Sequence, residues 1–309
     1  MMLRRTYLGL EVRREGLRAV AVQRRGKHVA LVGGKTLPLA ESLIQPGFKR
    51  PNVTNPDSFV SALRELMGPL VRGDNRIAVA LPDQTGNLFL LDVDTPFKNP
   101  SEGAEIVRWQ LKDRLPDKAQ RFALDYQVLE EKDSGHKRIL AAVVARDVLM
   151  HYEALIEQAG FAAAVIDFHS LALYNAYRSK IDFGRDFILI GVDGCQLTIL
   201  VFIQQIPVFY RGRQVEQNPQ QVFQELNRSL VNDRQQLPNF NRLPVYLHSD
   251  WHGDELITAV DSAFDQDVQT LTSPVSKLMN GHQLDFSGAE ANGMAVALGV
   301  AERMIQRVA

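Results

Sequence analysis

The chain has little cysteine, no large excess of charge of one sign and no long hydrophobic run. It has one cysteine, Cys195, among 309 residues, and a lone cysteine fits a protein of a reducing cytoplasm. Its 35 Lys and Arg residues balance 36 Asp and Glu residues. Because a non-specific nucleic-acid binder needs a surplus of cations to neutralise phosphates, we expect no nucleic-acid partner.

The longest apolar runs, at 139–145, 187–192 and 294–301, are far shorter than the roughly 20 residues that span a bilayer. The start of the chain is basic, but the charged segment 11–18 follows before an apolar signal-peptide core could form, so secretion is not expected. We therefore predict a cytoplasmic protein. Its length exceeds that of the usual single domain, which suggests two lobes with separate cores.

An alternating apolar pattern opens both halves of the chain. It predicts strands at 7–12, 17–23 and 28–33, and again at 187–192, 197–203 and 208–213. The recurrence suggests an internal duplication, with 182–185 as the hinge. Between the two meanders, Asn55 before Pro56 predicts the start of a helix. A strand at 76–81, helices at 146–159 and 170–177 and a strand at 163–167 complete the first half.

Residues 88–145 are predicted to form a small separate α+β unit. Its predicted strands are at 87–93, 122–129 and 138–145, and its predicted helix runs from 100 to 115. Asn99 can cap this helix, Pro100 takes its first position, and Glu102 can complete a capping box. One face of the helix is apolar at helical spacing and should pack on the unit's own sheet. That face consists of Ala104, Val107, Leu111 and Leu115.

Ile106 and Trp109 point away from that apolar face. A tryptophan in this position is often an interface anchor, so we predict that Ile106 and Trp109 contact a partner. The alternative is that they pack against the first lobe.

Five strings carry a resemblance to a known family: IVRWQLKDRLP from Ile106, FALDYQVL from Phe122, AGFAAAVIDFHSLAL from Ala159, IPVFYR from Ile206 and GMAVALGVA from Gly293. Together with the order of the elements, they resemble the PilM family of actin-like pilus assembly proteins. Relatives of that family include MshI proteins and the cytoplasmic part of GspL-type secretion proteins. The resemblance covers nearly the whole chain.

The resemblance implies the two-lobe α/β fold of actin, sugar kinases and Hsp70, with an extra subdomain like that of FtsA. The first lobe would comprise residues 1–87 and 146–183, the extra subdomain 88–145, and a reduced second lobe 184–309. In this fold each lobe supplies a turn whose backbone amides hold nucleotide phosphates, and an acidic residue in the turn positions a metal ion.

The phosphate turns depart from the family pattern. In the first turn Glu11 keeps an acid, but Arg13 replaces the glycine and Arg14 follows it. In the second turn an alignment without gaps puts Gly191 at the acid position, with Gly194 and Thr198 further along. A two-residue gap would place Asp193 there instead.

The third element should be a glycine-rich turn that covers adenosine. Here it reads His248, Ser249, Asp250, Trp251 and His252, which are mostly bulky. We therefore interpret the nucleotide site as degenerate and expect no catalytic residue and no cofactor, with ATP and Mg²⁺ binding as the alternative.

The other candidate sites have simpler interpretations. His248, Asp250 and His252 alternate as metal ligands can, but a polar turn is the favoured interpretation, and we expect no metal site. Cys195 has no His or other basic residue nearby in sequence to activate it as a nucleophile, so we predict that it is a packed small residue. The run Arg13, Arg14 and Glu15 is predicted to be a solvated turn rather than a partner contact.

The resemblance implies a cytoplasmic scaffold, peripheral to the inner membrane, in the assembly platform of a type IV pilus or a related type II secretion machine. Its expected partner is the cytoplasmic tail of a PilN-like bitopic membrane protein, bound between the first lobe and the extra subdomain. The assembly motor ATPase and further copies of the chain are possible partners. The alternatives are an ATP-dependent switch and the cytoplasmic arm of a longer bitopic protein.

Overall fold

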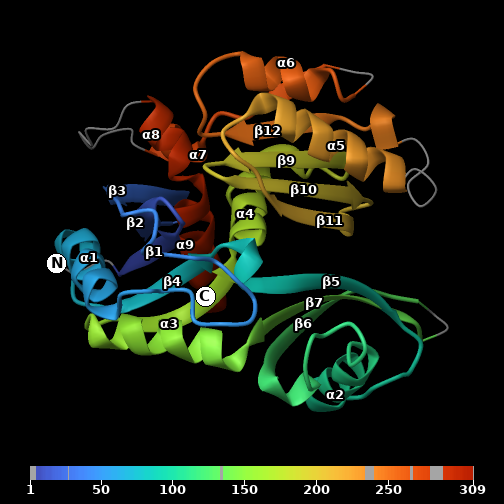
Figure 1. Cartoon of the computed structure of the whole chain (residues 1–309), viewed down its shortest axis with the longest axis horizontal. Coiled ribbons are helices and arrows are strands. Elements are labelled where there is room, and N and C mark those ends of the chain that lie inside the picture. Colours follow the sequence, from blue (N-terminus) through green and yellow to red (C-terminus); the bar gives the residue numbers. More distant parts are fainter. Residues whose placement is uncertain are drawn as a thin grey trace.

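The computed structural model describes residues 5–26, 28–132, 135–233, 240–264, 267–278 and 288–308. These residues form two five-stranded sheets and one three-stranded sheet. Figure 1 shows them as a first lobe around β1 to β4, a second lobe around β9 to β12, and a small subdomain that holds β5 to β7 and α2. The predicted organisation of two lobes and an extra subdomain is thus confirmed.

The first sheet has the order β3-β2-β1-β4-β8. Its first three strands form an antiparallel meander, and β4 and β8 join parallel to β1. Helices α1 and α3 cover one face. Asn55 caps α1 as predicted, since its side chain accepts a hydrogen bond from the backbone of Ser58 at 3.1 Å. The bounds are β1 (Thr6–Val12), β2 (Gly16–Arg25), β3 (His28–Pro38), β4 (Arg76–Leu81), β8 (Ala162–Phe168), α1 (Pro56–Met67) and α3 (Arg146–Gln158).

The second sheet repeats this plan in the order β11-β10-β9-β12-β13. An antiparallel meander again comes first, and two parallel strands follow. The equal topology supports the predicted internal duplication. Helices α5 and α6 cover its outer face. The bounds are β9 (Phe187–Asp193), β10 (Gln196–Ile203), β11 (Ile206–Gln214), β12 (Val245–Ser249), β13 (Val268–Thr270), α5 (Pro219–Asp233) and α6 (Glu255–Asp261).

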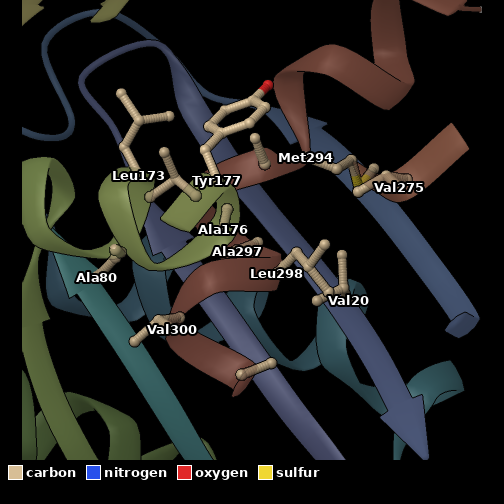
Figure 2. Close-up of a cluster of buried hydrophobic side chains, with 14 of the residues drawn as sticks. Val20, Ala80, Leu173, Ala176, Tyr177, Val275, Met294, Ala297, Leu298 and Val300 are labelled. Carbon is tan, nitrogen blue, oxygen red and sulfur yellow. The ribbon is translucent and has the colours of Figure 1, made fainter. Parts of the chain in front are cut away.

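Helices α4 (His169–Ile181) and α9 (Ala295–Val308) fill the space between the two large sheets, near the short helices α7 (Pro274–Leu278) and α8 (Gly288–Gly293). Figure 2 shows side chains of α4 and α9 packed with Val20 and Ala80 of the first sheet. A Cβ on Gly299 would lie 1.8 Å from the Ala172 carbonyl oxygen, so the two helices touch through backbone. Helix α9 also packs on β1, β2 and β4. It therefore lies on the first lobe's sheet, whereas the predicted boundary places it with the second lobe.

The small subdomain is a sheet of order β5-β7-β6 with α2 on one face. Helix α2 ends at Gln110, five residues before the predicted end. The N–H groups of Arg114 and Leu115 both donate to the Leu111 carbonyl, which winds the chain into a tight turn. Leu111 and Leu115 stay buried through this turn. The bounds are β5 (Gly86–Val93), β6 (Phe122–Glu131), β7 (Lys137–Ala145) and α2 (Pro100–Gln110), with short 3₁₀ turns at Gly68–Leu70, Asp83–Thr85, Ala119–Arg121 and Phe240–Arg242.

None of the helices in the described part of the chain combines the length and the apolar character that crossing a bilayer requires.

Candidate functional site

The chemically active side chains gather where the parallel strands of both lobes end. Glu11 lies near the end of β1, Asp193 ends β9, His169 follows β8, and Asp250 follows β12. Ligand sites in α/β folds form at the carboxyl ends of parallel strands. The duplicated sheets therefore bring these four residues together across the cleft between the lobes.

Arg13 extends from the β1–β2 turn into this cleft. Its Nη1 lies 2.8 Å from Asp193 Oδ1 and 3.0 Å from Asp250 Oδ2, both in the second lobe, and its side chain is 9% exposed. A Cβ on Gly194 would lie 2.0 Å from Arg13 Nη2, so this contact requires glycine at 194. The prediction of a solvated turn is wrong for Arg13, because ion pairing across the cleft holds it inside. Arg14 is exposed.

Arg18 of β2 makes a second bridge between the lobes. Its Nη1 lies 2.9 Å from Asp193 Oδ1, and its Nη2 lies 2.7 Å from Asp250 Oδ2. Arg18 also donates a hydrogen bond of 2.7 Å to the carbonyl of Gly293. Two guanidinium groups therefore hold the same two carboxylates, and the removal of either partner from a buried pair of this kind is costly.

The acid position of the second turn is taken by Asp193 and not by Gly191. Gly191 pairs with Thr198 inside the sheet, and a Cβ on Gly191 would lie 2.3 Å from the Leu173 side chain. Thr198 is likewise fully buried. Asp193 faces Glu11, so the alignment with a two-residue gap describes the structure. The backbone N–H of Gly194 donates to Asp250 Oδ1 at 2.8 Å.

Glu11 and His169 form a buried pair behind Arg13. His169 Nδ1 lies 3.1 Å from Glu11 Oε1, and both side chains are at most 4% exposed. Burial lowers the pKa of His169, but Glu11 outweighs this effect and raises the pKa to about 9. Burial, together with the charge of Asp193, raises the pKa of Glu11. His248 is also buried, with its Nδ1 2.8 Å from the Tyr177 hydroxyl and its Nε2 3.7 Å from Asp193 Oδ2.

The two aspartates of the cleft differ in their acidity. Burial raises the pKa of Asp250 to about 8, and the neighbouring Asp193 adds to the shift. Asp193 is fully buried, but Arg13 outweighs the burial and holds its pKa below the ordinary value. Asp193 is therefore the permanent anion of the pair.

The turn after β12 closes the cleft from the second lobe. Trp251 Nε1 donates to the Gly194 carbonyl at 2.9 Å, and Ser249 Oγ accepts from the Trp251 backbone at 2.9 Å. The Ser249 side chain thus stabilises the turn to which it belongs. His252 is exposed, so the alternating triplet His248, Asp250 and His252 does not converge.

A cavity of about 30 Å³ lies between the two turns, and its lining includes Arg13, Arg14, His169, Asp193 and Cys195. This volume fits an ion or a water molecule. Sites for ligands of nucleotide size measure about 300 Å³ or more. Burial raises the pKa of Cys195 to about 11, and the nearby Glu15 contributes, so its thiol is not a ready nucleophile.

Among the described residues, Glu11, His169 and Asp193 are close enough to hold a metal ion, since one donor atom from each lies within 4.8 Å of the others. His169 and Arg18 were missed by the sequence interpretation. The available signal for His169 was its place directly after the buried strand at 163–167, because such positions face the ligand site in α/β folds.

A groove of about 520 Å³ runs between the first lobe and the small subdomain. Its walls come from β6, β7, β8 and α3, and include Leu124, Leu140, Ala142, Val165 and Ile166. Strands β8 and β6 are both at sheet edges.

Ile106 and Trp109 lie outside this groove. Ile106 is half-buried and packs against the core of the small subdomain. Trp109 is 68% exposed on α2, with Lys112 Nζ 4.8 Å from its ring centroid. The alternative that Trp109 packs against the first lobe is therefore wrong.

No protein-family model and no curated protein matches the chain, but solved structures do. A structure described as a PilM-PilN type IV pilus biogenesis complex superposes with a TM-score of 0.79 at 18% identity, covering 97% of this chain and 99% of that one. The cytoplasmic domain of EpsL, an inner membrane component of the type II secretion system of Vibrio cholerae, gives a TM-score of 0.52 at 11% identity and covers 95% of both chains.

A Bacteroides thetaiotaomicron protein with an actin-like ATPase fold and unknown function gives a TM-score of 0.52 at 12% identity, covering 87% of this chain and 91% of that one. At these identities the likeness concerns the fold. The chain has an actin-like α/β fold.

Proposed function

We propose that the chain is a PilM-type scaffold of a type IV pilus or type II secretion assembly platform, and that it binds the cytoplasmic tail of a PilN-like membrane protein. The observation that carries this proposal is the groove between β8 and the β6–β7 pair. The likeness over the full chain to the PilM-PilN complex structure supports it. The protein would act in the cytoplasm, at the inner membrane, through its partner.

The groove has the features of a site for an extended peptide. Two edge strands border it, and edge strands offer unpaired N–H and C=O groups for an added strand. Its apolar walls can hold alternate side chains of such a peptide. Charged groups lie at one side, where Arg303 Nε pairs with Asp167 Oδ2 at 3.2 Å.

The contacts in the cleft support the proposal that this scaffold does not hydrolyse nucleotide. Arg13 and Arg18 bind the two aspartates of the second lobe, in the space where the fold's nucleotide-binding members hold phosphates. A bound nucleotide would need these pairs to break and the cavity of about 30 Å³ to grow about tenfold. We therefore propose a pseudo-ATPase, with an ATP-dependent switch as the rival.

A peptide-binding measurement tests this function. The probe is a fluorescent peptide with the cytoplasmic tail sequence of a PilN-like membrane protein, and binding is followed by anisotropy. Ala142 is half-buried in the groove wall, so Ala142→Arg should fill the groove and weaken binding at least tenfold.

Met150→Arg is the matched control, because Met150 is 63% exposed on α3 and does not line the groove. It should bind the tail like the unmodified protein. Equal affinities for both variants, or no binding by the unmodified protein, would refute the groove as the tail site.

A further inference from the structure

A further cavity, here called the β5–β11 cavity, lies between the second lobe and the small subdomain. Its volume is about 480 Å³, which is within the range of ligand sites. Its walls come from β5, β11 and the 3₁₀ turn before β5, and include Asn87, Leu88, Phe209, Arg211 and Arg213. Figure 1 shows β11 on the side of the second lobe that faces β5. No residue that lines this cavity lines the groove proposed for the tail, so the two are separate.

Both strands that border the β5–β11 cavity are edge strands of separate sheets. Strand β11 pairs with β10 on one side only, and such an edge offers N–H and C=O groups to an added strand. Phe209, Arg211 and Arg213 alternate along β11 and so share one face. They form a row of one apolar and two cationic side chains beside the free edge. An added strand would meet this row with its own alternate side chains.

Positive charge predominates beside this edge. Arg211 and Arg213 lie 3.9 Å and 4.0 Å from Glu225 Oε2, and Arg228 pairs with the same carboxylate. Three arginines therefore meet a single acidic side chain of α5, and half of the Arg213 side chain is exposed to solvent. The acidic residue of the cavity lining, Asp83, is buried and accepts hydrogen bonds from within the protein. A segment that carries carboxylates complements this surface.

We propose that the β5–β11 cavity binds an extended acidic peptide segment of another protein, which adds a strand to the edge of β11. Two acidic side chains at alternate positions would pair with Arg211 and Arg213, and an apolar side chain two positions further would contact Phe209. Asn87 and Leu88 form the opposite wall. In strand addition the main-chain hydrogen bonds give affinity and the side-chain contacts give specificity. The bound segment would join the second lobe to the small subdomain, whether or not the tail groove is occupied.

Peptide binding to the purified chain tests the preference for acidic segments. The probe is a fluorescent peptide in which glutamate alternates with valine, and lysine replaces each glutamate in the matched control peptide. The acidic peptide should bind at least tenfold more tightly than the control, and its affinity should fall as the salt concentration rises. No binding of the acidic peptide at about 1 mM, or equal affinities for both peptides, would overturn the proposal. Binding to vesicles of an anionic phospholipid without binding of the acidic peptide would overturn it as well.

Substitutions locate the peptide. Arg213→Glu should weaken binding of the acidic peptide about fivefold or more, because it replaces an attraction with a repulsion. Arg72→Glu is the matched control, since Arg72 is exposed in the first lobe and does not line the cavity. Should Arg213→Glu fail to fold, Asn87→Asp introduces a negative charge at an exposed position of the opposite wall and should also weaken binding. If the folded variants bind the acidic peptide like the unmodified protein, the cavity is not its site.

Amide hydrogen exchange tests the added strand itself. Amide hydrogens at the free edge of β11 should exchange more slowly when the acidic peptide is bound, because the new main-chain hydrogen bonds protect them. Strand α5 is not required for this readout, and the control peptide should give no such protection. Unchanged exchange along β11 at saturating acidic peptide would overturn the strand addition.

Discussion

Among the side chains of the first turn, Arg13 has the largest effect on the structure of the cleft between the lobes. A glycine at this place would leave backbone amides open to an anion. Arg13 instead fills the cleft with a guanidinium group that contacts Asp193 at 2.8 Å and Asp250 at 3.0 Å. The same residue thus occupies the turn and joins the lobes.

We expect Arg13→Ala to lower the free energy of unfolding by about 3 kcal/mol, because it leaves buried carboxylates with fewer cations. Arg14→Ala serves as the control, since Arg14 is exposed beside it. Chemical denaturation of both variants measures the difference. If the two variants are equally stable, the contacts of Arg13 across the cleft do not stabilise the closed lobes.

Glu302 of α9 provides a pH-dependent effect on stability. Its burial raises the pKa to about 7, although Arg178 opposes the shift. Between about pH 4.5 and pH 7 the folded protein therefore holds a proton that the unfolded chain has lost, and stability falls as the pH rises through this window. Glu302→Gln removes the cost of ionisation.

The expected gain from Glu302→Gln is on the order of 2 kcal/mol at pH 8 and close to zero at pH 4.5. Glu157→Gln, at an exposed position of α3, is the control and should show no such difference. Denaturation curves of both variants at the two pH values measure these changes in stability. A gain of the same size at both values would mean that packing, and not ionisation, is responsible.

At the scale of elements, helix α2 presents two different surfaces. Val107 is buried against the sheet of the small subdomain, while Trp109 is 68% exposed. Because Trp109 lies outside the groove, its surface is separate from the proposed tail site. If the proposed function holds, we expect this surface to contact a second component of the assembly platform, such as the motor ATPase.

Trp109→Ala should leave the melting temperature within about 1 °C of the unmodified value, since little buried area is lost. It should also leave the affinity for the tail peptide unchanged. Binding to the purified motor should fall by about 2 kcal/mol, the usual cost of losing an aromatic anchor. Calorimetry and binding measurements on one preparation test all three. A large loss of stability would show that Trp109 is packed in solution.

Several elements could be predicted from the sequence because their signals are local. The cap at Asn55, the helix start at Pro100 and the two meanders depend on residues within one turn or one strand of each other. The end of α2 could not be predicted, because Leu111 and Leu115 keep helical spacing while the chain between them forms a tighter turn. Apolar periodicity alone does not distinguish these two backbones.

For the whole molecule, the duplication could be predicted but not the contacts across it. Asp193 and Gly191 are two residues apart on the same face of β9, and only the tertiary structure shows that Asp193, at the end of the strand, contacts Arg13 and Arg18. Arg13 and Asp193 are distant in sequence, and their contact arises only when both sheets pack on α4 and α9. The sequence thus named Glu11, Arg13 and Asp193 as turn residues, while their ion pairs follow only from the tertiary structure.

The closed cleft leads to a prediction for the intact protein. At 1 mM, ATP with Mg²⁺ should shift the melting temperature by less than about 1 °C. A ligand with a Kd of about 10 μM would stabilise by roughly 2.7 kcal/mol at this concentration, or about 5 °C. Binding here must first separate Arg13 and Arg18 from Asp193 and Asp250, and this cost removes the net affinity. A kinase of the same fold, melted in parallel, shows that the assay detects nucleotide. A shift of several degrees with this protein would mean that the lobes open readily, and the rival ATP-dependent switch would then be the better description.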